Sequence, residues 1–405
     1  MKSGPALPLL LISNAAASLG AGVAMIAVPW LLVNRPGGAV MFGQLATIVN
    51  IILFIMTPFI GPFIDINPRK TLMISIRVVF IVTLIAITGL AQSSLLAGSD
   101  TLLVVYYTLG SFFYAFNIPL RSAYIRELFS KDQFVRVNSM MEIENQVAAV
   151  LTGVVAIFVI ERYGLGVLAM GNIACFAIAI ACIMAIPPVS GAERAAQMPA
   201  VFPALADGLR ITIRRPATAI MLIASTIPYV VVIFYTILHP IALSALPDAS
   251  GATYALVELL FGLGAIAGGI LMARVIHPGT ALRPLLEGMV FVFAIIAVTQ
   301  AMFQTYWGFV LLAAGFGLWN ATTRILRQSI LMRDFGINEI GRVGAFLQGW
   351  IMLLRASGIA TLTILINGGG AETAIWFAAF AASIGPILLV LARLPASIKK
   401  QQKVS

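Results

Sequence analysis

Long apolar segments of about twenty residues, joined by short polar links, make up most of this chain. A helix needs about 20 mostly apolar residues to cross a bilayer, where its backbone must satisfy its own hydrogen bonds. The chain is 60% hydrophobic and 10% charged, whereas about 25% of the residues of a soluble domain are charged. We therefore predict an all-α membrane protein with 12 transmembrane helices, at residues 7–33, 41–64, 71–94, 101–121, 137–160, 164–186, 217–240, 251–273, 284–303, 306–324, 343–366 and 373–394.

The first segment begins like a secretory signal peptide, with Lys2 followed by an apolar run and small residues at 15–17. The apolar run continues to Val33, which is far longer than the core of a signal peptide. We therefore expect residues 7–33 to form the first membrane helix.

One link is much longer than the others and is rich in proline and charge. It divides the chain into an N-terminal six-helix bundle at residues 1–186, a cytoplasmic linker at 187–216 and a C-terminal six-helix bundle at 217–405. Two patterns recur across this division, at offsets of 203 and 206 residues: Asn117–Arg121 with Asn320–Arg324, and Arg136 with Arg342. These offsets are close to half the chain length, so we predict two pseudo-symmetric halves.

The distribution of positive charge predicts the orientation in the membrane. With the N-terminus in the cytoplasm, 19 of the 25 Lys and Arg residues fall in cytoplasmic links or tails, and 2, Arg35 and Arg162, fall outside. The other 4 lie within or at the ends of helices: Arg77, Arg121, Arg324 and Arg355. Because cytoplasmic loops carry the excess of Lys and Arg, we expect both termini inside. This bias also accounts for the net charge of +10. We therefore expect the lipid bilayer, and no nucleic acid, as the partner of these charges.

The link at residues 61–70 carries a specific local pattern. Asn67-Pro68 ends a helix, because the proline has no N–H to donate and disfavours α geometry at the preceding residue. The charges around this break resemble the loop between helices 2 and 3 of the major facilitator superfamily, at Gly61, Asp65, Arg69 and Lys70. Pro68 stands where that family usually has glycine. The resemblance implies a role in conformational gating for this loop, with Arg77 in helix 3 and Arg121 in helix 4.

Further patterns resemble the branch of the superfamily that holds macrolide-efflux proteins and the enterobactin exporter: Val28-Pro29-Trp30, Arg77, Asn138, Ala204–Pro216 and Gly341–Gly344. The resemblance implies a monomer in a bacterial inner membrane that exports a small molecule by proton antiport, without a cofactor, as its halves rock around a central site. The chain departs from the pattern of proton antiporters in two places. Helix 1 of this branch often carries an acid near its middle, whereas Ser18–Gly22 holds none. Helix 5 of many proton antiporters carries a Gly-Pro pair, whereas Leu151–Val155 holds none.

Ionisable residues inside a membrane span are costly and are functional candidates by default. Helix 5 holds Glu142 and Glu144, about 9 and 12 Å along the helix from Arg136. We expect Glu142 to pair with Arg121 as a gate and Glu144 to point elsewhere; a static structural pair is the alternative. The position that corresponds to Glu142 in the second half is Gln348, so the acid occurs in one half only.

Three further charged residues lie within the predicted spans. Glu258 is about two turns into helix 8, where it could carry protons or simply reach water. Arg355 is close to mid-membrane in helix 11 and needs a counter-charge, so we expect it to bind substrate or to take part in coupling. Arg77 is about 10 Å into helix 3, and we expect a structural role there.

Aromatic and amide side chains fall on helices 1, 4, 7 and 10, which line the cavity in this superfamily. The resemblance places the substrate near Asn14, Tyr106, Tyr107, Tyr114, Asn117, Tyr229, Tyr235, Trp319 and Asn320. Aromatic walls with a few amides suit a medium-sized amphipathic ligand, although aromatics near helix ends also form interfacial belts. In helix 8, the spacing of four glycines predicts close helix packing at Gly262, Gly264, Gly268 and Gly269.

The sequence favours a transporter over an enzyme. It contains no His/Cys metal cluster, no nucleophile paired with a base and no phosphate-binding loop, so we expect no metal site and no catalysis. The membrane arginines favour an anionic, siderophore-like metabolite as substrate. A macrolide or multidrug efflux pump and a proton-coupled importer of the same fold are alternatives. Two hypotheses fall outside transport altogether. One is a non-transporting sensor or assembly subunit that keeps the fold, and the other is an enzyme acting on a lipid-linked substrate.

Overall fold

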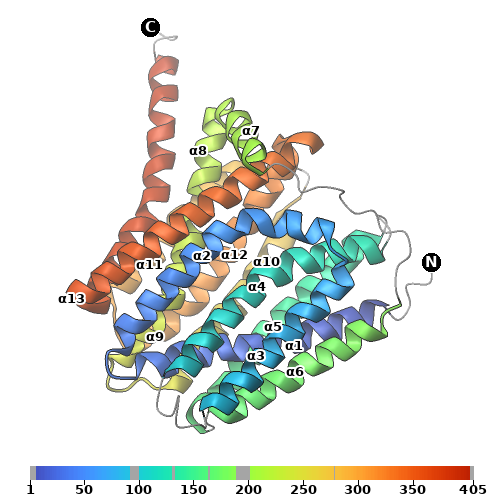
Figure 1. The fold of residues 1–405 in the computed structure, drawn as a ribbon. Helices are drawn as coiled ribbons and strands as arrows, with labels where there is room; N and C mark the ends of the chain where they lie inside the picture. The colour runs from blue at the N-terminus through green and yellow to red at the C-terminus, as the bar shows by residue number, and fades with distance from the viewer. Residues whose placement is uncertain are drawn as a thin grey trace. The chain divides into compact units, whose positions relative to one another are not determined.

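A computed structural model describes residues 6–91, 100–129, 133–162, 165–187, 201–277 and 279–401. These residues form α-helices joined by short turns, with no β-strand among them (Figure 1). The predicted all-α class is therefore confirmed. The chain divides into an N-terminal unit of Met1–Pro199 with Ser250–Leu259, and a C-terminal unit of Ala200–Ala249 with Leu260–Ser405.

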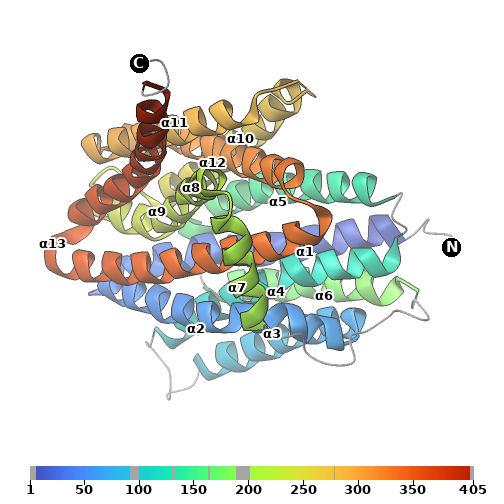
Figure 2. The same ribbon diagram turned by 90° about the horizontal axis from the view of Figure 1, so that it is seen from above.

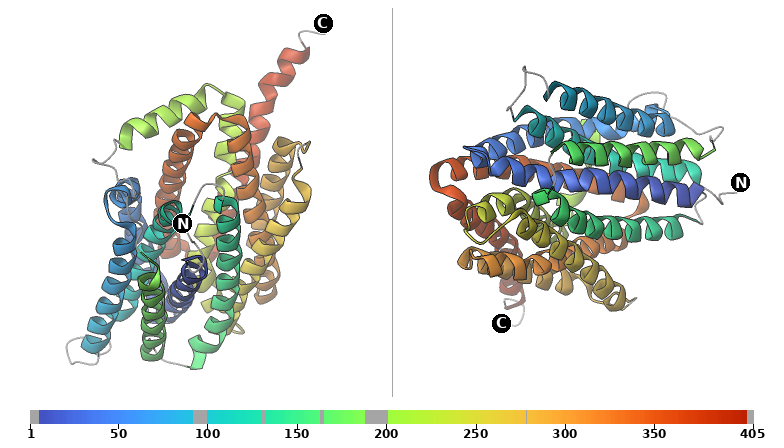
Figure 3. Two further views of the ribbon diagram at one scale, coloured as in Figure 1. Left: turned by 90° about the vertical axis from the view of Figure 1, so that its right-hand side faces the viewer. Right: turned by 90° about the horizontal axis from the view of Figure 1, so that it is seen from below.

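The N-terminal unit holds six complete helices: α1 Ala6–Val33, α2 Gly38–Ile66, α3 Arg69–Ala91, α4 Thr101–Leu128, α5 Phe134–Arg162 and α6 Leu165–Ala185. Helix α1 packs against α5 and α6, and α3 packs against α4 and α6, so these helices run alongside one another (Figure 3). Phe80, Phe113 and Phe176 form an aromatic core there, with ring centroids 4.5–6.3 Å apart. The apolar faces of the predicted spans therefore bury one another.

The C-terminal unit holds α7 Val201–Ile213, α8 Pro216–Ala224, α9 Ile227–Ser244, most of α10 Gly251–Val275, α11 Leu282–Met302, α12 Tyr306–Asp334 and α13 Ile337–Gln401. Helix α11 packs against α12 and α13, and α9 packs against α13. Helix α13 bends at Gly370, whose φ of 75° favours glycine because it lacks a Cβ (Figures 1 and 2). This bend separates the two spans predicted at 343–366 and 373–394.

The span predicted at 217–240 lies within one candidate membrane span, Pro216–Ser244, but its helix is interrupted, which the sequence analysis did not predict. The structure divides it into α8 and α9, with Ser225 and Thr226 between them. Pro228 explains the break, because it cannot donate the helical hydrogen bond to the carbonyl of Ala224. The hydroxyl groups of Ser225 and Thr226 donate instead to the carbonyls of Leu222 and Ile223, each at 2.7 Å.

Close packing by glycine is confirmed at two of the four predicted positions of α10. A Cβ at Gly264 would overlap the carbonyl oxygen of Ala314 on α12, and a Cβ at Gly268 would lie 2.6 Å from the carbonyl oxygen of Leu318. Nothing lies within 4 Å of such an atom at Gly262 or Gly269. The backbones of α10 and α12 therefore meet along one glycine stripe.

Among the described residues, 10 helical segments are long and apolar enough to cross a membrane. One of them, Arg342–Ala392, has 51 residues and contains the bend at Gly370. Helix α5 is 29 residues long, but within it only Val147–Ala156 counts as a shorter apolar helix. The structure therefore describes a multi-pass membrane protein, and the predicted number of twelve crossings stays a prediction.

Candidate functional site

A buried group of polar side chains lies at the centre of the N-terminal unit. We call it the polar cluster; it consists of Asn14 on α1, Asn117 and Arg121 on α4, and Glu144 and Asn145 on α5. Asn117 and Arg121 are one helical turn apart, so they share a face of α4. Because α1 packs against both α4 and α5, it carries Asn14 between the two helices that hold the charges.

The polar cluster is connected by hydrogen bonds and one ion pair. Arg121 Nη1 lies 3.8 Å from Glu144 Oε2 and donates to Asn145 Oδ1 at 2.7 Å. The side-chain amide of Asn14 donates to Glu144 Oε2 and, at 3.4 Å, to Asn145 Oδ1. Asn117 Nδ2 donates to Asn14 Oδ1 at 3.3 Å. Three helices are therefore joined by one network.

Both charges of the polar cluster are almost removed from water. Arg121 is 8% exposed and Glu144 is 9% exposed. Taking two charges out of water costs several kcal/mol per ion, which their attraction offsets only when geometry and extra hydrogen bonds are good. Asn14 donates to Glu144 and Asn145 accepts from Arg121, while Asn117 holds Asn14 in place. The pair is therefore stable as it stands but costly to break on one side.

The acid found at Arg121 is not the one that the sequence predicted. We expected Glu142 to pair with Arg121 and Glu144 to point elsewhere; the structure directs Glu144 to Arg121, so that orientation was wrong. The side chain of Glu142 lies outside the described residues, as do those of Arg136 and Asn138. Side chains two positions apart on a helix, such as those at 142 and 144, differ by roughly 200° in direction. Only the packing of α5 on α1 decides which of the two positions points inward.

The predicted loop at 61–70 is an ion-pair and capping site. Helix α2 ends at Ile66 and α3 begins at Arg69, so the break at Asn67-Pro68 is confirmed. Arg69 lies 3.6 Å from Asp65 and 3.3 Å from Glu127 at the end of α4. Lys70 donates to the carbonyls of Met184, at 3.0 Å, and Ile186 at the end of α6. A Cβ on Gly61 would meet nothing within 4 Å.

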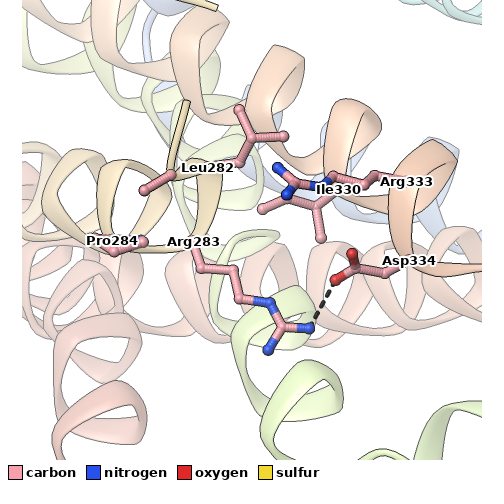
Figure 4. Close-up of a pocket in the computed structure, with 7 residues that line it drawn as sticks. Leu282, Arg283, Pro284, Ile330, Arg333 and Asp334 are labelled. Carbon is pink, nitrogen blue, oxygen red and sulfur yellow. Dashed lines mark hydrogen bonds and ion pairs between the residues drawn. The ribbon is translucent and has the colours of Figure 1, made fainter. Parts of the chain in front are cut away.

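The C-terminal unit repeats this arrangement. Arg283, at the start of α11, lies 2.7 Å from Asp334 at the end of α12 (Figure 4). In the same way, Arg69 at the start of α3 pairs with Glu127 near the end of α4. The Arg283 pair borders a pocket of about 340 Å³, lined by Ala281, Leu282, Arg283, Pro284, Ile330, Arg333 and Asp334 (Figure 4). Each unit thus has an ion pair that ties corresponding helix ends together.

Arg77 is the most deeply buried arginine among the described residues, with 1% of its surface exposed. Its Nη1 donates to the carbonyl of Met73, one turn earlier on α3, at 3.4 Å. Its Nε and Nη2 have no hydrogen-bond partner in the described part of the chain. The described contacts do not join Arg77 to the loop at 61–70, which was the expected structural role.

The remaining candidates are spread over both units. In the N-terminal unit, Tyr114 is part-buried and donates to the carbonyl of Ser18 at 3.4 Å, and Glu258 is half-buried on α10. In the C-terminal unit, Trp319 and Arg355 are half-buried, whereas Asn320 is buried. None of these side chains takes part in the hydrogen bonds described for the polar cluster.

Some aromatics expected to line a cavity are core residues instead. Tyr106 and Tyr235 are each 1% exposed. Tyr106 donates to the carbonyl of Leu168 at 3.3 Å, and the ring of Tyr235 lies 4.5 Å from that of Phe316. Tyr107 is also buried, with its ring 5.4 Å from Phe42. Large rings on inward helix faces fill the space between helices, which sequence position alone cannot distinguish from a cavity wall.

The sequence analysis gave no role to three residues that the structure brings into these sites: Asn145, Glu127 and Asp334. Glu127 and Asp334 carried a usable signal. Glu127 lies one residue before the end of α4, and Asp334 is the last residue of α12. The two positions are 207 residues apart, which is close to the offset of the recognised repeat. Asn145 carried none, because an amide next to two acids does not reveal its partner.

Comparison with known proteins agrees with this architecture. The sequence profile described as Major Facilitator Superfamily matches residues 10–359, and no curated protein sequence matches the chain. The structure of nucleoside transporter NupG is similar at 14% identity and a TM-score of 0.68, over 95% of this chain and 98% of that one.

Two more solved transporters share the fold. A bacterial homolog of the human lysosomal transporter Spinster matches at 12% identity and a TM-score of 0.65, over 97% of this chain and 96% of that one. The human organic anion transporter MFSD10 (TETRAN) matches at 14% identity and a TM-score of 0.65, over 96% and 100%. Identities this low show the fold alone, and with the profile they point to a transporter of small molecules rather than an enzyme. The chain belongs to the major facilitator superfamily.

Proposed function

We propose that this protein is a secondary active transporter that exports a small amphipathic or anionic molecule, such as a siderophore-like metabolite, by proton antiport with alternating access. The observation that carries the proposal is the ion pair of Arg121 and Glu144, buried between helices of a membrane transporter. Ionisable groups in such positions mark proton relays and substrate pathways.

The polar cluster supports a specific coupling step. Glu144 is the only carboxylate among the five cluster residues, so a proton bound there would remove the charge that neutralises Arg121. Arg121 would then keep its hydrogen bond to Asn145 but carry an unbalanced charge. An anionic substrate group, or release of the proton, would restore the balance. The carboxylate of Glu144 and an anionic substrate group would thereby compete for Arg121, which couples protonation of Glu144 to substrate binding. Whether the proton then moves against the substrate, as proposed, or with it is decided by the flux measurement below.

The proposed topology follows from the described helices. Counting Arg342–Ala392 as two crossings, because of the bend at Gly370, and adding α5 to the other apolar segments gives twelve. An even number places both termini on one side, and the distribution of Lys and Arg favours the cytoplasm. We propose a monomer in a bacterial inner membrane, driven by the proton gradient without a cofactor.

The substrate class rests on charge and on the aromatic side chains. Half-buried Arg355, for which we proposed a substrate or coupling role, and the polar cluster both favour an anion. Tyr114 and Trp319 are part-buried rings that suit an amphipathic ligand. One similar structure is described as an organic anion transporter, which is support by fold-level analogy only.

The test is proton flux in proteoliposomes that contain a pH-sensitive dye. A citrate-type siderophore, a hydroxamate siderophore and a macrolide are added in turn. We expect proton flux that depends on one of the two siderophores and is abolished by Glu144→Gln. The matched control is Arg35→Gln, which breaks the exposed pair of Arg35 with Asp100 and should leave flux unchanged.

The other outcomes separate the alternatives. Flux with the macrolide alone would replace the siderophore assignment with drug efflux. Substrate movement without proton flux would remove proton coupling and the role of Glu144. Proton and substrate moving in the same direction would identify an importer. If no compound moves, the proposed substrate class is wrong.

A further inference from the structure

Arg324 and Arg327, about one turn apart on α12, have no acid among their described partners. Arg327 Nη1 donates to the carbonyl of Ser225, at the end of α8, at 2.8 Å. Arg324, one turn earlier, is exposed and makes no hydrogen bond or ion pair in the described part of the chain. The two guanidinium groups are close enough to act on each other's charge, with Tyr229 as a further neighbour. The result is a local charge of two cations inside a span.

Comparison of the two halves shows that the C-terminal unit lacks the acid that neutralises the arginine in the N-terminal unit. Arg324 corresponds to Arg121 at the offset of 203 residues. Arg121 is neutralised by Glu144 on α5. With the offset of 206 residues that relates α5 to α13, the position of Glu144 is occupied by Trp350. The C-terminal unit has therefore kept the arginine, lost its acid and gained a second cation at Arg327.

Arg327 points away from the exposed apolar face of α12, and Arg324, which is exposed, lies to the side of that face. The exposed apolar residues Trp307, Leu311 and Met332 mark one stripe of α12. At about 100° of rotation per residue, Arg324 lies roughly 100° and Arg327 roughly 160° around the helix from that stripe. The bond of Arg327 to Ser225 agrees with this direction, because it joins α12 to the break between α8 and α9. Figure 2 shows α8 and α9 as the two pieces on either side of that break.

A third polar group completes the arrangement. Asn320 lies one turn before Arg324, on the same side of α12, and is 5% exposed. Its Oδ1 atom is buried and has no hydrogen-bond partner in the described part of the chain. Leaving a buried amide oxygen without a hydrogen bond is costly, so it marks a place where a hydrogen-bonding ligand group would be stabilised. Asn320, Arg324 and Arg327 therefore offer one acceptor beside two sets of N–H donors.

From this geometry we infer a binding site for an anion that also carries a hydroxyl group. Arg324 and Arg327 bind its carboxylate or phosphate, and Asn320 accepts a hydrogen bond from its hydroxyl group. Arg327 has N–H groups to spare, since the Ser225 carbonyl uses one of five. The inference rests on the proposed function, because it names the substrate class and places part of the substrate site in the C-terminal unit.

The test measures thermal stability of the full-length protein in phosphatidylcholine nanodiscs, which add no anionic lipid. Unfolding is followed with a thiol-reactive dye, which reads the free cysteines Cys175 and Cys182. The probes are citrate, tricarballylate, which lacks the hydroxyl group, neutral trimethyl citrate, and glycerol 3-phosphate. A ligand that binds the native state raises the unfolding temperature with its concentration.

We expect citrate or glycerol 3-phosphate to stabilise the wild type, and trimethyl citrate to have no effect. Arg324→Gln should lower the affinity for the anion that stabilises the wild type about 10- to 100-fold, as expected for the loss of a hydrogen bond to a charged group. Arg274→Gln is the matched control, because Arg274 is an exposed arginine near the end of α10 and should leave the affinity unchanged. Asn320→Ala should abolish the preference for citrate over tricarballylate.

Two results would overturn the site: neither anion stabilises the wild type, or Arg324→Gln responds as the wild type does. Arg324 has no hydrogen bond or ion pair to lose in the described part of the chain, so misfolding of this variant is not expected. The measurement needs no transport and therefore separates the two proposals. Proton-coupled flux of another substrate without anion binding would keep the transporter and remove the site. Anion binding without proton flux would keep the site and remove the antiport.

Discussion

Replacing Glu144 with glutamine tests the central ion pair most directly. The change keeps the size of the side chain and an oxygen that can accept from Asn14, but it removes the charge facing Arg121. At 3.8 Å and an effective dielectric constant of about 20, the attraction is about 4 kcal/mol. The hydrogen bond from Arg121 to Asn145 remains and offsets part of the loss. We expect Glu144→Gln to lower the free energy of unfolding by about 2–4 kcal/mol.

A double-mutant cycle isolates the pair from other effects of the substitution. Arg121→Gln alone should also destabilise, because it leaves the carboxylate of Glu144 buried without its cation. The double variant removes both charges. Its loss of unfolding free energy should be smaller than the sum of the two single losses, and the difference is a coupling energy of about 2–4 kcal/mol. Reversible unfolding by sodium dodecyl sulfate in mixed micelles measures all four free energies.

The exposed pair of Arg35 with Asp100 gives the control for this cycle. Its side chains are 52% and 27% exposed, and Asp100→Asn should change the free energy of unfolding by about 0.5 kcal/mol or less. A coupling energy below about 0.5 kcal/mol between positions 121 and 144 would refute the reasoning. The two charges would then be hydrated, or neutralised by other groups, and the buried pair could not serve as the coupling step.

Three further changes test the packing and the helix ends. Gly264→Ala should destabilise by about 2 kcal/mol or more, because the new methyl group overlaps a backbone carbonyl on α12, whereas Gly262→Ala should be near neutral because nothing is within 4 Å; both are compared in the same micelle unfolding assay. Lys70→Gln should cost about 1 kcal/mol and increase hydrogen exchange at the end of α6, where Lys70 binds two carbonyls; unchanged exchange would contradict that capping role. Gly370→Ala should cost about 1 kcal/mol, because φ is 75°, and Gly368→Ala, without a positive φ, should cost less; equal losses in thermal unfolding would mean that the bend does not need glycine.

Much of the fold was predictable because its signals are local. Apolar runs of sufficient length and the break at Asn67-Pro68 predicted most helices, since a backbone in lipid must form its own hydrogen bonds. The offset between Asn117–Arg121 and Asn320–Arg324 indicated a repeat. The acids of the Arg69 and Arg283 ion pairs lie at the similar offset of 207 residues, whereas the two arginines are 214 residues apart and correspond only by their place at a helix start. The break between α8 and α9 was missed, although Pro228 was a visible signal for it.

The candidate site was predictable only as a set of residues. The amino-acid sequence was enough to show that few charges lie in the spans, that Arg121 and Arg324 occupy related positions, and that an acid accompanies only the first. Tertiary structure decided which side chains meet: Glu144 turns to Arg121, Asn14 joins them from α1, and Arg327 reaches the break after α8. The physical reason is that hydrophobicity acts residue by residue along the chain, whereas the direction of a polar side chain depends on how each helix is rotated against its neighbours.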